Sequence, residues 1–304
     1  MEKVSCLGMP NCYKLTNGTI EVVVATDVGP RVLAYNFVGG ENVFGAVPGA
    51  VVTTALGDWK PWGGHRLWTA PEVNPRSYAP DNDAVDFEFE GELTARLTAR
   101  TEPHTGLKKE IVVALDPEGS GVTVRHRIRN RNLWAVEFAP WALSIMNGEG
   151  GEANLPQEPY RSWGNYVLPA RPLVLWHYTD LTDTRLTLGK KFIRLRTDAA
   201  NDEQQKIGLM NKQGWAAFRR GTTLFVKRFD YEEGATYPDY GCNVEAFTAG
   251  TFLEIESLAP LRHLEPEATV EHVERWTLFQ NFDAGATEDS LADALDAILP
   301  GATS

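Results

Sequence analysis

The stretch FEFEGELTARLTAR, residues 87–100, alternates strictly between two kinds of side chain. Phe, Gly, Leu and Ala occupy its odd-numbered positions, whereas Glu, Thr and Arg occupy its even-numbered positions. In an extended chain successive side chains point to opposite faces, so this pattern creates one apolar face and one polar face. The stretch therefore predicts a half-buried β-strand or hairpin.

The same two-residue period recurs along the chain. In VTVRHRIRN, residues 122–130, valine and isoleucine share one face with His126, which we therefore interpret as a core histidine. Glycine, proline, aspartate and asparagine separate the alternating runs, as expected for turns. Further strands are predicted at residues 19–26, 31–37, 108–115, 136–146, 171–179, 191–197, 214–220, 223–229, 243–249, 251–258 and 269–279.

One helix is predicted, near the C-terminal end. In TEDSLADALDAIL, residues 287–299, acidic residues come first, leucines follow at helical spacing, and a proline stands just beyond. The sequence shows no regular alternation of strands and helices, so it does not predict a parallel sheet. The sequence thus predicts an all-β protein in which two antiparallel sheets pack face to face. We expect one β-sandwich domain over residues 1–304, with 284–304 as a helical tail.

Composition restricts the partners and the compartment. The formal net charge of −12 repels polyanions, so neither nucleic acid nor a membrane surface is expected as a partner. No apolar run has the length of a signal peptide core or a membrane span. The three cysteines, Cys6, Cys12 and Cys242, have no CxxC spacing, which argues against a disulfide framework and a zinc site. We expect a soluble cytoplasmic protein.

Nucleotide and hydrolase motifs are also missing from the sequence. It contains no GxGxxG, no P-loop, no HExxH and no GxSxG. We therefore expect no cofactor and no metal ion.

Four segments together resemble one known superfamily. They are WGGHRLWTAPE (62–72), APWALSIMNGEGGEANLP (139–156), YPDYGCNVEAF (237–247) and TFLEIESLAPLRHLEPEATVEHVERWTLF (251–279). The sequence resembles the galactose mutarotase-like, or aldose 1-epimerase-like, superfamily, and most closely a bacterial branch of unsettled function. The resemblance implies an antiparallel β-supersandwich and a sugar-binding cleft.

Two glutamates in TFLEIESL are candidates for the site. Glu254 and Glu256 share one strand face, ~6.6–6.8 Å apart along the backbone. Two carboxyl groups on a partly apolar face raise the pKa of at least one of them, which suits a general base. Mutarotases use a Glu in a corresponding Leu-Glu to take the proton of the anomeric hydroxyl, so the resemblance implies that Glu254 is the base. The alternative is that both glutamates are solvated on an open sheet face.

The proton donor is harder to place. The superfamily usually supplies a histidine from a central strand, but APWALSIMNGEGG, residues 139–151, contains none. His65 is the preferred substitute, because the adjacent Gly-Gly allows a loop to approach a ligand closely. His177 is a second candidate. The alternative for His65 is a loop histidine bonded to backbone.

Several further side chains are candidates for sugar contacts. Arg66 has paired donors for hydroxyl or carboxylate groups, or it pairs with Glu72 to hold the loop. Trp62 and Trp68 offer flat surfaces for a sugar ring, although most tryptophans are core residues. The remaining candidates are polar groups that suit ring hydroxyls: Glu72, Glu256, His177, Tyr237, Asp239 and Glu245.

Three functions are consistent with these residues. The first is an isomerase that interconverts sugar anomers with Glu254 as base and His65 as acid. The second is a non-catalytic carbohydrate-recognition domain, favoured by the histidine missing from the central strand. The third is a glycoside hydrolase or lyase, disfavoured because the paired carboxyl groups are neighbours on one strand. All three imply a small carbohydrate as ligand and leave its identity, its phosphorylation and the oligomeric state open.

Overall fold

The computed structural model describes residues 2–164 and 166–299. Its strands form two large sheets in which neighbours run antiparallel. Sheet I contains, in spatial order, β1 (Glu2–Cys6), β2 (Met9–Thr16), β3 (Ile20–Ala25), β4 (Arg31–Phe37), β9 (His65–Ala70), β14 (Val136–Met146), β23 (Phe252–Leu258), β22 (Val244–Ala249), β19 (Gln205–Leu209) and β16 (Leu173–Leu175), with β24 (Arg262–Leu264) paired to β14.

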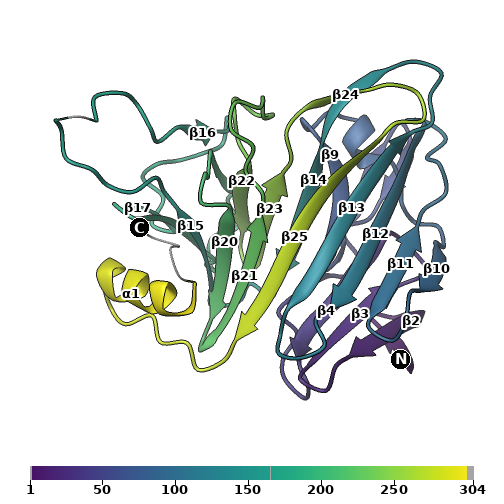
Figure 1. The fold of residues 1–304 in the computed structure, drawn as a ribbon, viewed down its shortest axis with the longest axis horizontal. Coiled ribbons are helices and arrows are strands. Elements are labelled where there is room, and N and C mark those ends of the chain that lie inside the picture. The colour runs from purple at the N-terminus through teal and green to yellow at the C-terminus, as the bar shows by residue number, and fades with distance from the viewer. Residues whose placement is uncertain (1, 165, 300–304) are drawn as a thin grey trace.

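Sheet II packs against sheet I (Figure 1). In spatial order it contains β10 (Asp86–Phe89), β11 (Thr94–Thr98), β12 (Leu107–Leu115), β13 (Val122–Asn130), β25 (Thr269–Phe279), β21 (Thr223–Phe229), β20 (Trp215–Arg220), β15 (Gly151–Pro156), β18 (Phe192–Arg196) and β17 (Leu186–Leu188). A continuous apolar core fills the space between the sheets. The predicted antiparallel β-sandwich is therefore confirmed.

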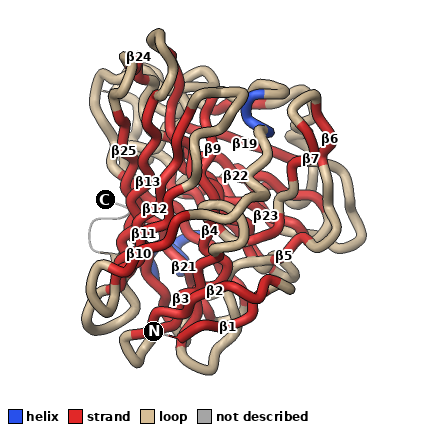
Figure 2. The backbone as a smooth tube through the Cα atoms, turned by 90° about the vertical axis from the view of Figure 1, so that its right-hand side faces the viewer, coloured by secondary structure: helices blue, strands red, loops and turns tan. Residues whose placement is uncertain are grey.

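Two short ribbons and two helical segments complete the described structure. β5 (Ala46–Val47) pairs with β8 (Trp62–Gly63), and β6 (Val52–Thr54) pairs with β7 (Gly57–Trp59). β6 and β7 lie on the side of sheet I away from sheet II (Figure 2). The helical segments are η1 (Arg76–Tyr78) and α1 (Glu288–Ile298). No helix within residues 2–164 and 166–299 is long and apolar enough to cross a membrane.

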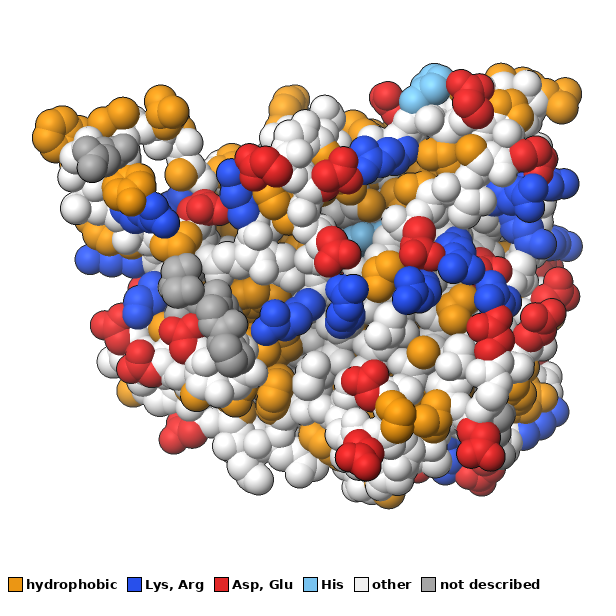
Figure 3. Space-filling view, in the orientation of Figure 1, with side chains coloured by type: hydrophobic (Ala, Val, Ile, Leu, Met, Phe, Trp, Pro, Cys, Tyr) orange, Lys and Arg blue, Asp and Glu red, His pale blue; other side chains and the backbone are white. Residues whose placement is uncertain are grey.

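The alternating stretches form the strands that their period predicts. Residues 87–100 form the β10–β11 hairpin, in which Ala95 and Leu97 are buried. The polar faces of β11, β12, β13 and β25 look outward and carry ion pairs. Arg96 pairs with Glu110, and Arg127 bridges Glu110 to Glu271. Acidic and basic side chains consequently intermix over this face (Figure 3).

The segment WGGHRLWTAPE differs from the predicted loop, because residues 65–70 form the central strand β9. Its glycines serve the packing of backbone against backbone. A Cβ added at Gly63 would lie 2.4 Å from the carbonyl oxygen of Gly45, and one at Gly64 would lie 2.1 Å from that of Val32. Both residues also have positive φ angles, which glycine adopts without strain. The Gly-Gly pair thus lets β9 enter sheet I and is not a ligand-contact loop.

The segment between β15 and β17 forms a protruding arm. Of the strand predicted at 171–179, only Leu173–Leu175 is a strand, and a backbone hydrogen bond from Thr179 to Trp176 closes a turn after it. Apolar side chains are exposed along the arm, where they form an orange group at the upper left of Figure 3. The end of this arm nearest β16 lies beside the cleft described below.

Helix α1 packs on sheet II. The Thr287 side chain accepts a hydrogen bond from the Ser290 amide and caps the first turn. The Glu288 carboxylate accepts backbone hydrogen bonds from the loop and start of β18. Leu291, Leu295 and Leu299 are buried among aromatic side chains of sheet II. The predicted C-terminal helix is thus an integral part of the sandwich surface.

Because Leu295 is fully buried, Leu295→Ala should lower the free energy of unfolding by about 2–5 kcal/mol. Urea unfolding would measure it, with the exposed Asp293→Ala as a matched control expected to stay within about 0.5 kcal/mol of the wild type. A single shifted transition would indicate one folding unit. A wild-type midpoint for Leu295→Ala would contradict the packing of α1 on sheet II.

Candidate functional site

Three adjacent strands of sheet I form the floor of a cleft. Because side chains alternate along a strand, β9, β14 and β23 each present one set to the core and another to the opposite face. The side chains on the opposite face line a cleft of about 430 Å³. Residues of β7, β19, β22, η1 and the base of the arm complete its walls. The lining residues are Val52, Trp59, Pro61, Arg66, Trp68, Glu72, Tyr78, Trp141, Leu143, Trp176, Tyr178, Gln204, Lys206, Phe247, Phe252, Glu254 and Glu256.

Glu254 is held by a buried ion pair. Arg66 Nη1 lies 2.6 Å from Glu254 Oε1, and the two side chains are 5% and 10% exposed. The Arg66 guanidinium also stacks over the rings of Trp59 and Trp68, at 5.3 and 4.7 Å from their centroids. Burial raises the pKa of Glu254, and Arg66 opposes this shift only in part. The carboxyl group is therefore oriented and shielded from solvent, and its raised pKa makes it a stronger base than an exposed glutamate.

Glu256 belongs to a second charged cluster. Its Oε2 accepts hydrogen bonds from Trp141 Nε1 at 2.9 Å and from Lys206 Nζ at 3.1 Å. Lys206 Nζ also lies 2.7 Å from Glu245 Oε2 and stacks over the rings of Trp141 and Trp176. Glu245 lies directly opposite Glu256 in the β22–β23 register. One buried ammonium therefore stands between two buried carboxyl groups.

Some polar atoms of the cleft still lack partners. Trp59 Nε1, Arg66 Nε and Glu256 Oε1 are buried, yet none has a hydrogen-bond partner among the described residues. An unsatisfied buried polar atom costs free energy. This set of donors and acceptors beside the cleft suits a ligand that both donates and accepts hydrogen bonds. A polyhydroxylated ring does so, and its C–H faces suit the aromatic walls.

The structure brings together five of the candidates predicted from the sequence: Arg66, Trp68, Glu72, Glu254 and Glu256. Glu245 lies beneath them against Lys206. Burial raises the pKa of Asp239, and the nearby Lys206 and Glu245 oppose this shift. Glu72 accepts a hydrogen bond from Tyr78, and not from Arg66 as the loop-holding alternative suggested.

Three predicted contacts lie outside the cleft lining. The Trp62 ring packs beside the apolar cluster of Met9 and Val28, and its Nε1 donates to Asn82. Tyr237 is buried, and its hydroxyl accepts a hydrogen bond from the Glu232 amide. His177 is exposed, because the turn at the base of the arm directs Trp176 and Tyr178 into the cleft instead.

Sequence reasoning missed Lys206 and most of the aromatic lining. Trp141 and Leu143 alternate with buried core residues on β14, so the period of that predicted strand could have indicated their shared face. Lys206 has a weaker signal, because QKIGL contains one charge in a short apolar run. Its role depends on pairing between β19 and β22, which no local pattern reveals.

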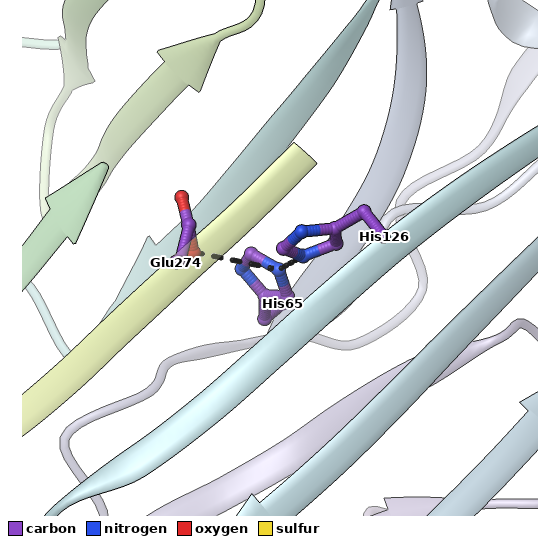
Figure 4. A group of neighbouring side chains, drawn as sticks. All are labelled: His65, His126 and Glu274. Atoms are coloured by element: carbon purple, nitrogen blue, oxygen red, sulfur yellow. Dashed lines mark hydrogen bonds and ion pairs between the residues drawn. The ribbon is translucent and has the colours of Figure 1, made fainter. Parts of the chain in front are cut away.

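His65 occupies the core side of β9, opposite to Arg66. It is fully buried, with Ser144 Oγ 2.8 Å from its Nδ1. His126 Nε2 lies 2.6 Å from its Nε2 (Figure 4). His126 Nδ1 lies 3.0 Å from the carbonyl oxygen of His272, so we assign the proton of His126 to Nδ1. His65 then donates from Nε2 to His126. The predicted acid is therefore separated from the cleft by its own strand.

The histidine pair continues into a charged network. Lys227 Nζ donates to Glu274 Oε1 at 2.8 Å, and Trp276 Nε1 donates to Glu274 Oε2 at 2.7 Å. Ser257 Oγ donates to Glu274 Oε1 at 2.5 Å and accepts from His272 Nε2 at 2.7 Å. These bonds join sheet II to sheet I directly behind the cleft.

The same cluster contains the residue types of a metal site. One ligand atom each from His65, His126 and Glu274 lie within 4.8 Å of one another. The 2.6 Å between the two imidazole nitrogens is instead a distance at which one ring donates to the other. Because both oxygens of Glu274 accept hydrogen bonds from protein groups, we interpret the cluster as a hydrogen-bonded network.

Comparisons with known proteins define the fold. No protein-family model matches this sequence, and no curated protein sequence matches it. Solved structures do match. A galactose mutarotase-like protein from Lactobacillus casei has a TM-score of 0.56 and 11% identity over 88% of this chain and 100% of that chain. A galactose mutarotase related enzyme from Lactobacillus acidophilus has a TM-score of 0.57 and 9% identity over 90% and 98% of the two chains.

A galactose mutarotase-like protein from Clostridium acetobutylicum is similar to the same degree, with a TM-score of 0.56 and 10% identity over 92% and 98% of the two chains. These comparisons span nearly the whole of each protein. The chain therefore has the galactose mutarotase-like fold, as its sequence resemblance implied. At such identities the likeness describes the fold alone.

The Arg66–Glu254 pair should be strongly coupled. Arg66→Met should lower the free energy of unfolding by about 3 kcal/mol, because it leaves a buried carboxyl group without its cation. The double variant Arg66→Met/Glu254→Gln should recover most of that loss, as measured by urea unfolding at pH 7. Arg100→Met, at an exposed pair with Asp83, is the control, expected to change stability by less than about 0.5 kcal/mol. Additive losses in the double variant would contradict the coupling.

The buried histidines should make stability depend on pH. Burial lowers the pKa of His272 from 6.5 to about 3, so below pH 6.5 the unfolded chain binds a proton that the native protein does not. Stability from this group is complete above pH 6.5 and declines as the pH falls. The His272→Gln variant keeps a side-chain donor for Ser257 but has no group that takes up this proton. As the pH falls, its free energy of unfolding should therefore decrease less steeply than that of the wild type, by up to about 1.4 kcal/mol per pH unit.

Urea unfolding of both proteins between pH 7.5 and 5.5 measures the difference in slope. The exposed His263 provides the control, since His263→Gln should keep the wild-type slope. Parallel curves for the wild type and His272→Gln would refute the assignment of a neutral buried His272.

Proposed function

We propose that this cleft binds a carbohydrate and interconverts its anomers by acid–base opening of the sugar ring. The observation that carries the proposal is the Glu254 carboxyl group, buried at the floor of an aromatic cleft and oriented by Arg66. The likeness in fold to galactose mutarotase-like proteins supports the same activity class. Anomer exchange requires no redox chemistry, so side chains suffice as catalysts.

Glu254 acts as the general base in this proposal. It takes the proton of the anomeric hydroxyl while the bond between the anomeric carbon and the ring oxygen breaks. The ring oxygen receives a proton, and the open aldehyde rotates about its bond to the next carbon. Reclosure on the other face returns both protons to their donors. Burial raises the pKa of Glu254, which brings its basicity toward the pH of the reaction.

Lys206 is the proposed proton donor to the ring oxygen. Among the described lining residues there is no histidine, and Trp141 and Leu143 occupy the cleft face of β14. Lys206 lies in the same cross-strand row as Glu254, with Phe247 between them. Strand spacing places their backbones ~9–10 Å apart, so a sugar ring that lies over Phe247 would lie between the two functional groups. Glu245 and Glu256 hold the ammonium in place.

A non-catalytic carbohydrate-binding function is the second candidate. Leu143 favours it, because an apolar residue stands on the strand from which the superfamily usually supplies its histidine. A glycoside hydrolase has less support. Glu254 and Glu256 lie on one face of one strand, whereas glycoside hydrolysis uses carboxyl groups on either side of the scissile bond.

Glu254→Gln tests the base directly. The variant keeps the size and the acceptor for Arg66 but cannot take a proton, so anomer exchange should fall by a factor of about 100 or more. Two-dimensional exchange NMR of the anomeric protons, across a panel of aldoses, measures the rate. Line broadening should persist, because binding does not need proton transfer.

Glu265→Gln, at an exposed turn position, is the matched control and should exchange anomers at the wild-type rate. Unchanged exchange in Glu254→Gln would show that another group is the base. Binding without exchange in the wild type would favour the non-catalytic function.

A further inference from the structure

Negative charge exceeds positive charge around the cleft. Among the described residues that line it or lie directly beneath it, five carry carboxyl groups and two carry cationic groups. The acidic residues are Glu72, Asp239, Glu245, Glu254 and Glu256, and the basic residues are Arg66 and Lys206. The carboxyl groups thus outnumber the cationic groups by three. A ligand that carried a phosphate or a carboxylate would increase this excess.

Both cations are already engaged. Arg66 lies 2.6 Å from Glu254, and Lys206 lies 2.7 Å from Glu245 and 3.1 Å from Glu256. Each cation also stacks over two tryptophan rings, so rotation toward a bound anion would break packing as well as an ion pair. Within the described lining there is consequently no free cation for an anionic sugar.

Glu256 provides the open position for a ligand. Its Oε2 is bound by Trp141 and Lys206, whereas its Oε1 has no hydrogen-bond partner among the described residues. The side chain is 1% exposed and belongs to the lining of the cleft, so Oε1 is a carboxyl oxygen of the lining that no described protein group occupies. A charge-assisted hydrogen bond is the strongest contact that such an oxygen forms.

Two carboxyl groups of this cluster have raised pKa values. Burial raises the pKa of both Glu245 and Asp239, and Lys206 opposes this shift. A bound cation would stabilise the ionised forms and so lower both pKa values. Binding of a cationic ligand should therefore release protons to the solution.

We propose that the cleft selects a sugar that carries a protonated amine, whose N–H groups donate to Glu256 Oε1. The walls around this oxygen suit a cation, because Trp141, Trp176 and Tyr178 present aromatic rings to the cleft. The charge of Lys206 does not prevent this, since Glu245 lies closer to it than Glu256 does. The inference rests on the proposed carbohydrate-binding function and adds the chemical class of the sugar.

Isothermal titration calorimetry with D-glucosamine, N-acetyl-D-glucosamine, D-glucose and D-glucose 6-phosphate tests the proposal on the wild-type protein. The acetylated sugar is the matched control, because it keeps the nitrogen and removes the charge. Glucosamine should bind at least about tenfold more tightly than the two neutral sugars, and the phosphate most weakly. Titration in phosphate and in Bis-Tris, both at pH 6.5 where free glucosamine is protonated, should give different enthalpies, since the buffer takes up the released protons.

Glu256→Gln locates the contact. Its amide oxygen still accepts from Trp141 and Lys206, but no negative charge remains for the amine. The preference for glucosamine over N-acetylglucosamine should fall to within about threefold, while Glu265→Gln should keep the full preference. Should Glu256→Gln fail to fold, the comparison of charged and acetylated sugars on the wild type still decides the proposal.

Several results would overturn it. Equal affinities for glucosamine and glucose would refute the amine preference and leave the proposed carbohydrate function standing. Tighter binding of the phosphate, or occupation of the cleft by Ca²⁺ in place of glucosamine, would also refute it. If none of the four sugars bound, the proposed function itself would fail together with this inference.

Discussion

A fully buried ion pair between Lys227 and Glu274, both on sheet II, lies behind the cleft and is hydrogen-bonded to sheet I. Buried charges are tolerated only when their hydrogen bonds are satisfied, and here Glu274 also accepts from Trp276 and Ser257. Lys227 donates in addition to the carbonyl oxygen of Ile255, at 3.2 Å. Ile255 lies between Glu254 and Glu256 in the sequence. The hydrogen bond from Lys227 in the core therefore helps to fix the position of the strand that carries both cleft carboxyl groups.

The strict alternation of side chains divides β9, β14 and β23 between two tasks. Their core faces carry His65, Ser144 and Ser257, which belong to the network between the sheets. Their cleft faces carry alternate residues of the same strands, among them Arg66 and the two glutamates. The site is therefore built on three rigid, hydrogen-bonded strands rather than on loops, and its geometry is inherited from the packing of the sandwich.

Much of the architecture follows from local sequence patterns. The period of residues 87–100 and 122–130 predicts strands at the places where β10, β11 and β13 occur, because burial on one face imposes that period. The helical spacing of leucines near the C-terminus predicts α1 for the same reason. The shared face of Glu254 and Glu256 is likewise a local property, since residues two apart on a strand lie on the same side.

The sequence by itself thus determined the antiparallel β architecture, the C-terminal helix and the pairing of two carboxyl groups on one strand face. Only the tertiary structure decided which face became cleft and which became core. It placed His65 against His126 in the core, and it brought Lys206 to Glu256. The physical reason is that periodicity records whether a side chain is buried or exposed, whereas a buried polar residue obtains its role from strands distant in the sequence.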